Sequence, residues 1–225
     1  METCPANGDT SNTSVIQSGT LKTHYVLVIL GSSRVGKTAI VQQFLYDTFP
    51  DVYKATVEEF HRSEYKLKDF VLTLDILDTS GSYEFPAMKR LAINMGDAFV
   101  LVYSIDDAQS FEDVCREREY VQQARSLDVP IVVVGNKCDR EDHREVGKEL
   151  TESVVTMDWE NGFVEASAKT KMNIFEIFNE LLAQARAPSE LSVCLERRRQ
   201  SLPIFSVAPK VKYDLDLKRH SCVIS

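Results

Sequence analysis

The sequence lacks the features that mark secreted, disulfide-stabilised and membrane-spanning proteins. It has only five cysteines, an odd number without CxxC spacing, which argues against a disulfide framework and against a zinc ribbon. Residues 1–30 contain no basic segment followed by a long apolar run, and the other apolar runs are only long enough for strands. Glu2 follows Met1 where N-myristoylation requires glycine. A reducing compartment fits best, and any membrane contact needs another route.

The chain also lacks the excess of positive charge that general binding to nucleic acids requires. Its formal net charge is −8, whereas phosphate backbones are held by Lys and Arg. The charge is unevenly distributed, because residues 187–225 hold seven Lys or Arg and four Asp or Glu, a net +3 that leaves −11 on residues 1–186. We therefore expect an acidic body with a basic tail and no nucleic-acid partner.

Length and composition favour one globular domain with two flexible ends. The 225 residues can form one sizeable core, and 44% hydrophobic with 27% charged residues is usual for a globular protein. Residues 1–22 are rich in Thr, Ser, Asn and Gly and predict a disordered leader. Hydrophobic periodicity stops after residue 186, so residues 187–225 are expected to form a flexible basic tail. The domain is expected over residues 23–186, as a monomer.

Apolar runs alternate with helical patterns along this domain. Runs rich in Val, Ile and Leu predict strands covered on both faces, at residues 25–30, 70–77, 98–103 and 131–134, and a short strand is expected at residues 163–166. Helices are expected at residues 37–45, 85–94, 109–125, 146–156 and 174–185. Asn173 and Glu176 predict a capping box for the last helix, and Pro188 would end it. The alternation predicts an α/β fold with a mainly parallel, doubly wound sheet, helices on both faces, and a ligand at the carboxyl ends of the strands.

The first predicted strand leads into a phosphate-binding motif. Gly31-Ser32-Ser33-Arg34-Val35-Gly36-Lys37-Thr38 satisfies GxxxxGK[ST] directly before a predicted helix. Here backbone N–H groups and the helix dipole would cradle phosphates, Lys37 would neutralise the β and γ oxygens, and the Thr38 hydroxyl would ligate Mg²⁺. A chance glycine-rich turn is the alternative, and the strand and helix on either side disfavour it. The motif alone leaves kinases, ATPases and GTPases open.

Two later motifs indicate which base is bound. Asn136-Lys137-Cys138-Asp139 follows a strand, and Asp139 can accept both N1–H and N2–H of guanine, whereas adenine would leave this carboxylate unpaired. Ser167-Ala168-Lys169 follows the next strand, where the Ala168 N–H can reach guanine O6 and Lys169 can lie over the ring. The order of the motifs favours GTP and GDP as ligands over an ATP-using kinase.

With these motifs in this order, residues 22–186 resemble a Ras-type small GTPase. Asp78-Thr79-Ser80-Gly81 resembles the family's DxxG motif, which implies that Asp78 holds Mg²⁺ through water and that the Gly81 N–H senses the γ-phosphate. The resemblance further implies that Thr56 ligates Mg²⁺ and that Phe49 packs on the guanine edge, although a core Phe is the alternative for Phe49. Residues 31–41, 75–91, 188–192 and 222–225 look most like the branch of dexamethasone-induced Ras and Rhes.

Three residues near the expected γ-phosphate depart from the Ras pattern. The resemblance assigns catalysis to Lys37, Thr56, Gly81 and the position of Ser82, where most of the family has the Gln that orients the attacking water. Ser33 and Arg34 stand where most Ras proteins have Gly, so Ser33 would crowd the water and Arg34 must point outward. We expect slow hydrolysis and a GTP-biased switch, unless Tyr83, Glu84 or a partner positions the water. The alternative is a guanine-nucleotide-binding scaffold without useful turnover.

The same resemblance implies an effector-binding surface between the first helix and the second family motif. Its residues would be Tyr53, Lys54, Ala55, Thr56, Val57, Glu58, Glu59 and Phe60, and an ordinary solvated edge is the alternative. The sequence identifies no particular effector, exchange factor or activator.

The last four residues predict a lipid anchor. Cys222-Val223-Ile224-Ser225 is a C-a-a-X pattern whose Ser favours farnesylation by a prenyl transferase. One lipid chain binds a membrane only marginally, so basic residues such as Lys218 and Arg219 would supply a second signal at an anionic membrane surface. We expect reversible attachment to the cytoplasmic face of the plasma membrane, with a cytosolic pool.

Overall fold

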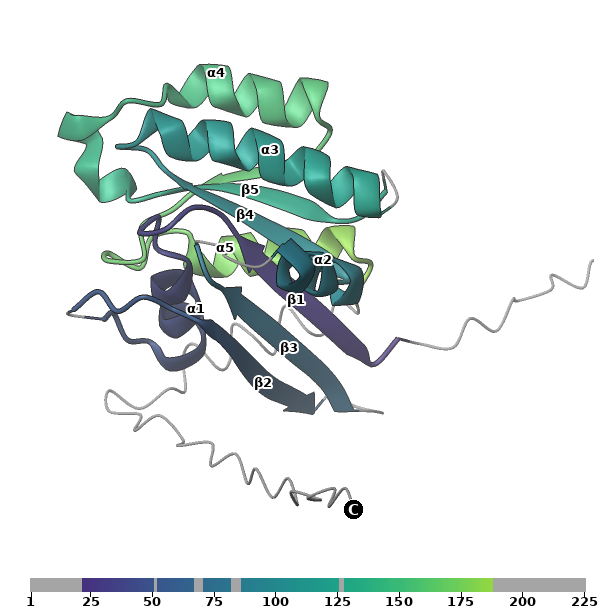
Figure 1. Ribbon diagram of the computed structural model, residues 1–225. Helices are drawn as coiled ribbons and strands as arrows, with labels where there is room; N and C mark the ends of the chain where they lie inside the picture. The colour runs from purple at the N-terminus through teal and green to yellow at the C-terminus, as the bar shows by residue number, and fades with distance from the viewer. Residues whose placement is uncertain (1–21, 51, 67–70, 82–85, 126–127, 188–225) are drawn as a thin grey trace, which may run out of the picture.

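A six-stranded β-sheet forms the centre of the domain, with helices packed on both of its faces (Figure 1). The computed structural model describes residues 22–50, 52–66, 71–81, 86–125 and 128–187. The predicted leader other than Lys22, the predicted tail after Ala187, and Ser82 with its neighbours lie outside the described residues.

The strands are β1 His24–Leu30, β2 Glu58–Lys66, β3 Val71–Thr79, β4 Ala98–Ser104, β5 Ile131–Asn136 and β6 Gly162–Glu165. Their order in the sheet is β2-β3-β1-β4-β5-β6, and only the β2–β3 pair is antiparallel. The predicted α/β fold with a mainly parallel, doubly wound sheet is confirmed. Because β3 and β4 flank β1, the loop after β1 lies where the strand order reverses, which is the usual ligand-binding point of such a sheet.

Strand β2 was not among the predicted strands. Eight of its nine residues are exposed or half-buried, and Tyr65 is the buried one. The charged sequence of this edge strand hides the apolar pattern used to predict strands, and charges at an edge also oppose unwanted pairing. Its position depends on pairing with β3, which places Arg62 directly opposite Asp75.

The helices divide the core into two layers. Helices α1 (Lys37–Tyr46) and α5 (Ile174–Gln184) cover one face, where Phe44 stacks on Phe178 with ring centroids 3.7 Å apart. Helices α2 (Pro86–Met95) and α3 (Ala108–Ala124) cover the other face. Helix α4 (Lys148–Ser153) continues into a π-helical segment, Val154–Asp158, and both follow a 3₁₀ segment at Cys138–His143. None of the helices in the described part of the chain is long and apolar enough to span a membrane.

The predicted capping box at the start of α5 is wrong. Asn173 has a left-handed backbone with φ of 55° and makes no side-chain cap, whereas an N-cap residue typically has an extended backbone. Its Nδ2 instead donates to the Glu165 carbonyl at 2.8 Å, which ties the start of α5 to the end of β6. Helix α5 ends at Gln184, and Pro188 lies outside the described residues.

Candidate nucleotide-binding site

The loop between β1 and α1 can form only because two glycines allow close backbone approaches. Gly31 and Gly36 have φ values of 138° and 101°, in the region that side chains disfavour. A Cβ on Gly31 would lie 2.1 Å from the Val102 carbonyl oxygen, and one on Gly36 would lie 2.2 Å from Asn136 Nδ2. The loop therefore sits against β4 and β5 and points the N-terminus of α1, with its unpaired N–H groups, into the cavity beside it.

Lys37 arches back over this loop. Its Nζ donates to the carbonyl oxygens of Gly31 at 2.8 Å and Ser32 at 2.9 Å, and the side chain is buried. Burial lowers the pKa of Lys37 to about 8, against the opposing effect of the Asp78 and Glu117 charges. A bound polyphosphate would favour the protonated amine, so this arrangement is suited to an anionic ligand.

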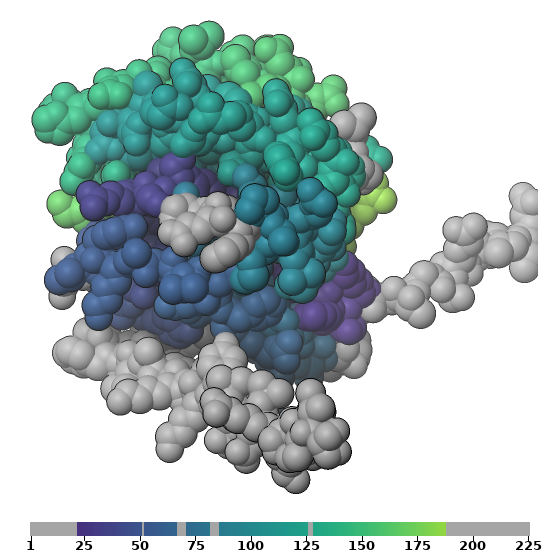
Figure 2. Space-filling model, viewed as in Figure 1, coloured from purple at the N-terminus to yellow at the C-terminus, as the bar shows by residue number. Residues whose placement is uncertain are grey.

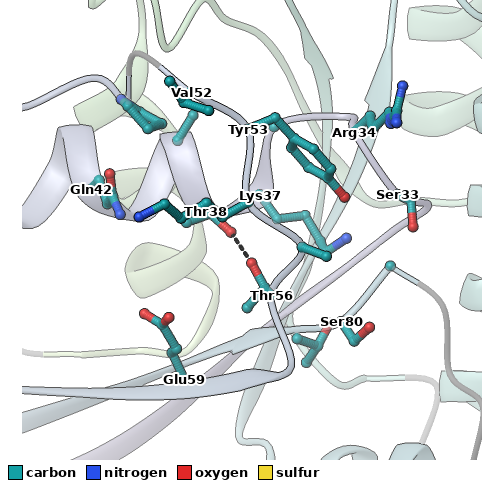
Figure 3. A pocket seen from close by; sticks show the side chains of 17 residues that line it. Ser33, Arg34, Lys37, Thr38, Gln42, Val52, Tyr53, Thr56, Glu59 and Ser80 are labelled. Carbon is teal, nitrogen blue, oxygen red and sulfur yellow. Dashed lines mark hydrogen bonds between the residues drawn. The ribbon is translucent and has the colours of Figure 1, made fainter.

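The three residues predicted to hold Mg²⁺ come together from separate elements. Thr38 Oγ1 donates to Asp78 Oδ2 at 2.6 Å. The same Thr38 hydroxyl lies 2.7 Å from Thr56 Oγ1 (Figure 3). Asp78 is fully buried, its Oδ1 has no hydrogen-bond partner within the described residues, and burial raises its pKa to about 6. A buried carboxylate oxygen without a partner, beside two hydroxyls, fits a hard cation such as Mg²⁺. The described residues contain no group of three His, Cys, Asp or Glu that could hold a metal, so phosphates and water would have to complete the coordination.

Gly81 brings the loop after β3 against the phosphate loop. A Cβ on Gly81 would lie 2.3 Å from the backbone nitrogen of Ser33. Ser33, which is exposed, and Gly81 both line a cavity of about 500 Å³, together with Lys37, Thr38 and Thr56. We call this the phosphate cavity. Ser33 therefore borders the phosphate cavity, while Ser82 lies outside the described residues.

A second cavity, of about 420 Å³, is lined by the residues predicted to bind the guanine base, and we call it the base cavity. It is lined by Phe49, Asn136, Lys137, Asp139, Ala168 and Lys169, among others. Buried Ser167 donates from Oγ to Asp139 Oδ1 at 2.6 Å and accepts from the Thr170 N–H at 3.1 Å. Ser167 therefore orients the carboxylate of Asp139, and Phe49 is a cavity-lining residue with 44% exposure rather than a core residue.

Asn136 connects the loops of the two cavities. Its Nδ2 donates to the Val35 carbonyl at 2.8 Å, and its Oδ1 accepts the Ala168 N–H at 3.2 Å. Both Asn136 and the Val35 side chain are buried. The phosphate loop and both base-reading loops are thereby joined through one side chain.

Sequence reasoning missed two acidic residues that support the site. Asp106, just after β4, accepts from Lys137 Nζ at 3.3 Å and from Arg140 Nη1 at 2.8 Å. Burial alone would raise the pKa of Asp106, but hydrogen bonds from Ser104 and Arg140 and the charge of Lys137 hold it at about 2.

The second missed residue is Asp113 on α3, which accepts a hydrogen bond from the Ser32 hydroxyl. Asp106 could have been found from the sequence, because it lies just beyond a predicted strand. No local sequence pattern indicates that Asp113 reaches the phosphate loop.

Comparison with known proteins agrees with this geometry. Residues 26–187 match the Ras family. The chain belongs to the Ras family. It is 41% identical to the GTP-binding protein Rhes of Homo sapiens over 187 residues, which cover 79% of this chain and 70% of Rhes. Rhes of Mus musculus and of Rattus norvegicus are each 40% identical over the same shares. The protein is thus a Ras-type small GTPase of the Rhes branch, and the two cavities hold the family's nucleotide motifs.

The predicted effector segment of this Ras-family protein forms one wall of the phosphate cavity. Lys54, Ala55, Thr56 and Glu59 line the cavity, while Val57 is 86% exposed. Glu58 is half-buried, and burial raises its pKa. Figure 2 shows the purple residues of the phosphate-loop region exposed between the blue residues that follow them in the chain and the green C-terminal half. The predicted effector segment therefore extends from the wall of this cavity to the exposed surface.

Proposed function

We propose that this Ras-family protein is a magnesium-dependent GTP/GDP switch with slow intrinsic hydrolysis and a GTP-biased state. The observation that carries the proposal is the convergence of Thr38, Thr56 and Asp78 beside Lys37. Each of the three comes from a different segment, so a ligand that engages them joins these segments. Thr38, Thr56 and Asp78 would hold Mg²⁺, which would supply positive charge to stabilise the negative charge of the phosphates.

The switching step would involve residues in segments that connect helices and strands. Thr56 lies in the segment between α1 and β2, and Gly81 lies just beyond β3 against Ser33. A γ-phosphate would draw both backbones inward, and its loss would release them, as in other phosphate-sensing switches. The exposed segment around Val57 would then differ between the GTP and GDP states and be recognised by effectors in one of them.

Slow hydrolysis is supported by crowding at Ser33 and by the short side chain of Ser82. Ser33 lines the phosphate cavity and its backbone lies against Gly81, so its side chain would crowd the space where an attacking water and an activator's arginine have to meet. Ser82 cannot reach as far as a glutamine from the same backbone. Both changes remove contacts in the transition state without weakening ground-state binding of GTP.

Single-turnover phosphate release tests this proposal. We expect the natural sequence to turn over below the roughly 4 × 10⁻⁴ s⁻¹ of Ras and to respond little to a Ras-type activator. Ser33→Gly with Ser82→Gln should raise activator-stimulated turnover by orders of magnitude, and each single change should recover less, because both act on one geometry. A Ras-like response of the natural sequence would show that Tyr83, Glu84 or the partner positions the water, and the GTP-biased state would be wrong.

A guanine-nucleotide-binding scaffold without useful turnover is the second candidate. The Ser33 side chain in the phosphate cavity favours it. The same assay separates the two: a scaffold would retain GTP over many hours with no phosphate release, whereas a slow switch would release one phosphate per bound GTP.

We also propose that the protein is farnesylated at Cys222 and attached reversibly to the cytoplasmic face of the plasma membrane. The C-a-a-X pattern supports the lipid, and the net +3 of residues 187–225 supports attraction to an anionic leaflet. The acidic remainder of the chain would be repelled by that leaflet, so attachment through the tail alone is favoured.

A further inference from the structure

Arg34 and Tyr53 form a pair at the edge of the site that the motifs did not predict. The Arg34 guanidinium carbon lies 5.2 Å from the centroid of the Tyr53 ring, within the range of a cation–π contact. Arg34 belongs to the loop after β1, and Tyr53 to the segment between α1 and β2. Figure 3 shows the two side chains next to each other at one rim of the cavity.

This pair borders both cavities. Arg34 and Tyr53 line the phosphate cavity and also the base cavity, and the other residues common to both are Gly36, Ala39 and Pro50. A nucleotide with its phosphates in one cavity and its base in the other must cross the boundary beside these two side chains. Of the shared residues, only Arg34 and Tyr53 have side chains long enough to cover that boundary.

The backbone of Arg34 shows that a side chain is kept here against a local preference. Its φ of 66° lies in the left-handed region, which is uncommon for a residue with a Cβ and favours glycine. Backbone strain of this kind clusters at functional sites, where surrounding structure holds it. An arginine with this backbone, at the border of two cavities, is a candidate for contact with the ligand.

The charge of Arg34 is also available to an anionic ligand. Lys37 donates to loop carbonyls, and Lys137 and Arg140 are both paired with Asp106. Arg34 is exposed and forms no ion pair with another described residue. Its contact with the neutral Tyr53 ring leaves the positive charge uncompensated at the edge of a polyphosphate site.

We propose that Arg34 is a nucleotide-retaining residue. Stacked on Tyr53, it closes the boundary between the two cavities and slows the release of bound guanine nucleotide. Arg34 thereby fastens the phosphate loop to the segment that carries Thr56. This inference rests on the binding of guanine nucleotide in these cavities.

Release of a fluorescent GDP analogue tests the proposal in the full chain. The protein is loaded in the presence of Mg²⁺ and then chased with excess unlabelled GDP. Arg34→Ala should release the analogue about two- to fivefold faster, as expected for loss of an exposed cation–π contact. Alanine is preferred to glycine because it keeps a Cβ at the strained backbone, and Arg34→Gly then reports the effect of relieving that strain. Arg125→Ala, which removes an arginine at the far end of α3, is the matched control and should release at the natural rate.

Two further variants separate stacking from charge. Arg34→Lys keeps the charge but stacks less well, so it should also release faster than the natural sequence. Combining Arg34→Ala with Tyr53→Leu should release no faster than the quicker single variant, because the two residues act through one contact. Thermal unfolding of each variant verifies that it is folded.

Three results would overturn the inference: Arg34→Ala releasing at the natural rate, Arg34→Lys restoring the natural rate, or fully additive effects of the two positions. Failure of the natural sequence to retain labelled GDP would instead contradict the guanine-nucleotide site itself. The two failures are therefore distinguishable in one assay.

Discussion

At the scale of single residues, the site depends on side chains whose orientation is set by other protein groups. Asp139 is oriented by the Ser167 hydroxyl, and Lys37 is held over the phosphate loop by carbonyl oxygens. Such supporting contacts fix a side chain before the ligand arrives, so less conformational entropy is lost on binding. Substitution of one such residue should therefore change one identifiable property of the protein, such as base preference or stability at a given pH.

Substitution of Asp139 should change which base is bound. In Asp139→Asn the amide places a donor where the carboxylate accepted from guanine, so affinity for GDP should fall while affinity for XDP rises. Competition of both nucleotides against a fluorescent analogue measures the preference. A variant that still prefers GDP over XDP would mean that Asp139 does not read the base.

Asp75 should make stability depend on pH at the acidic end. Its buried carboxylate accepts from Arg62 Nε at 2.8 Å and Nη2 at 2.7 Å, and from His24 Nε2 at 2.8 Å. The Arg62 hydrogen bonds in particular hold the pKa of Asp75 below its usual value of 3.8. A carboxylate with a depressed folded pKa stabilises the fold above its unfolded pKa, and this stabilisation is lost as the pH falls through the folded value.

Asp75→Asn should therefore destabilise the fold by about 1–3 kcal/mol at pH 7, and the difference from the natural sequence should shrink below about pH 4. Urea unfolding across this range measures the effect. Glu152→Gln, which changes an exposed carboxylate on α4, is the control. A difference that stays constant down to low pH would exclude Asp75 as the titrating group.

At the scale of elements, the site is made where loops from different strands meet. The loops after β1, β5 and β6 are joined by Asn136, and the loop after β3 contacts the loop after β1 through Gly81. The parallel strands bring these loops to one edge of the sheet, but their mutual positions depend on such cross-links. The loop network should thus be sensitive to loss of one buried amide.

Asn136→Ala should disturb both cavities together. It would leave the Val35 carbonyl and the Ala168 N–H without their present partner, at a cost of about 1–3 kcal/mol each where no water replaces it. We expect lower stability in urea unfolding and faster release of labelled GDP. Asn94→Ala, at an exposed position on α2, should change neither quantity. If Asn136→Ala is less stable but releases labelled GDP at the rate of the natural sequence, Asn136 acts in folding alone.

At the scale of the whole molecule, the proposed anchor is separate from the nucleotide site. Cys222 lies outside the described residues, whereas all residues that line the phosphate and base cavities lie between Ser33 and Lys169. Cys222→Ser should therefore leave GDP binding unchanged and move the protein from the membrane fraction to the soluble fraction. Fractionation of cells expressing each form decides this. A variant that remains membrane-bound would place the anchor elsewhere.

The basic residues of the tail should act together with the lipid. Binding of the natural, lipidated chain to anionic vesicles should weaken as salt is raised, because the attraction of Lys and Arg to the surface is screened. Sedimentation of vesicles at increasing salt measures the bound fraction. Binding that ignores salt would remove the basic residues as a second signal.

The sequence alone determined the features that depend on neighbouring residues. Five of the six strands, the phosphate motif and the base motifs could be predicted, because strands and phosphate-binding loops have short, contiguous sequence patterns. The tertiary structure decided the rest. Strand β2 exists because it pairs with β3, and Asn173 ties to Glu165 instead of capping α5.

The side-chain contacts that support the site also could not be predicted from the sequence. Asp113 reaches Ser32, and Arg34 reaches Tyr53, from segments that no local pattern relates. Such contacts arise only after the sheet has brought distant loops to one edge, where burial and hydrogen bonding select side chains that have no periodicity of their own.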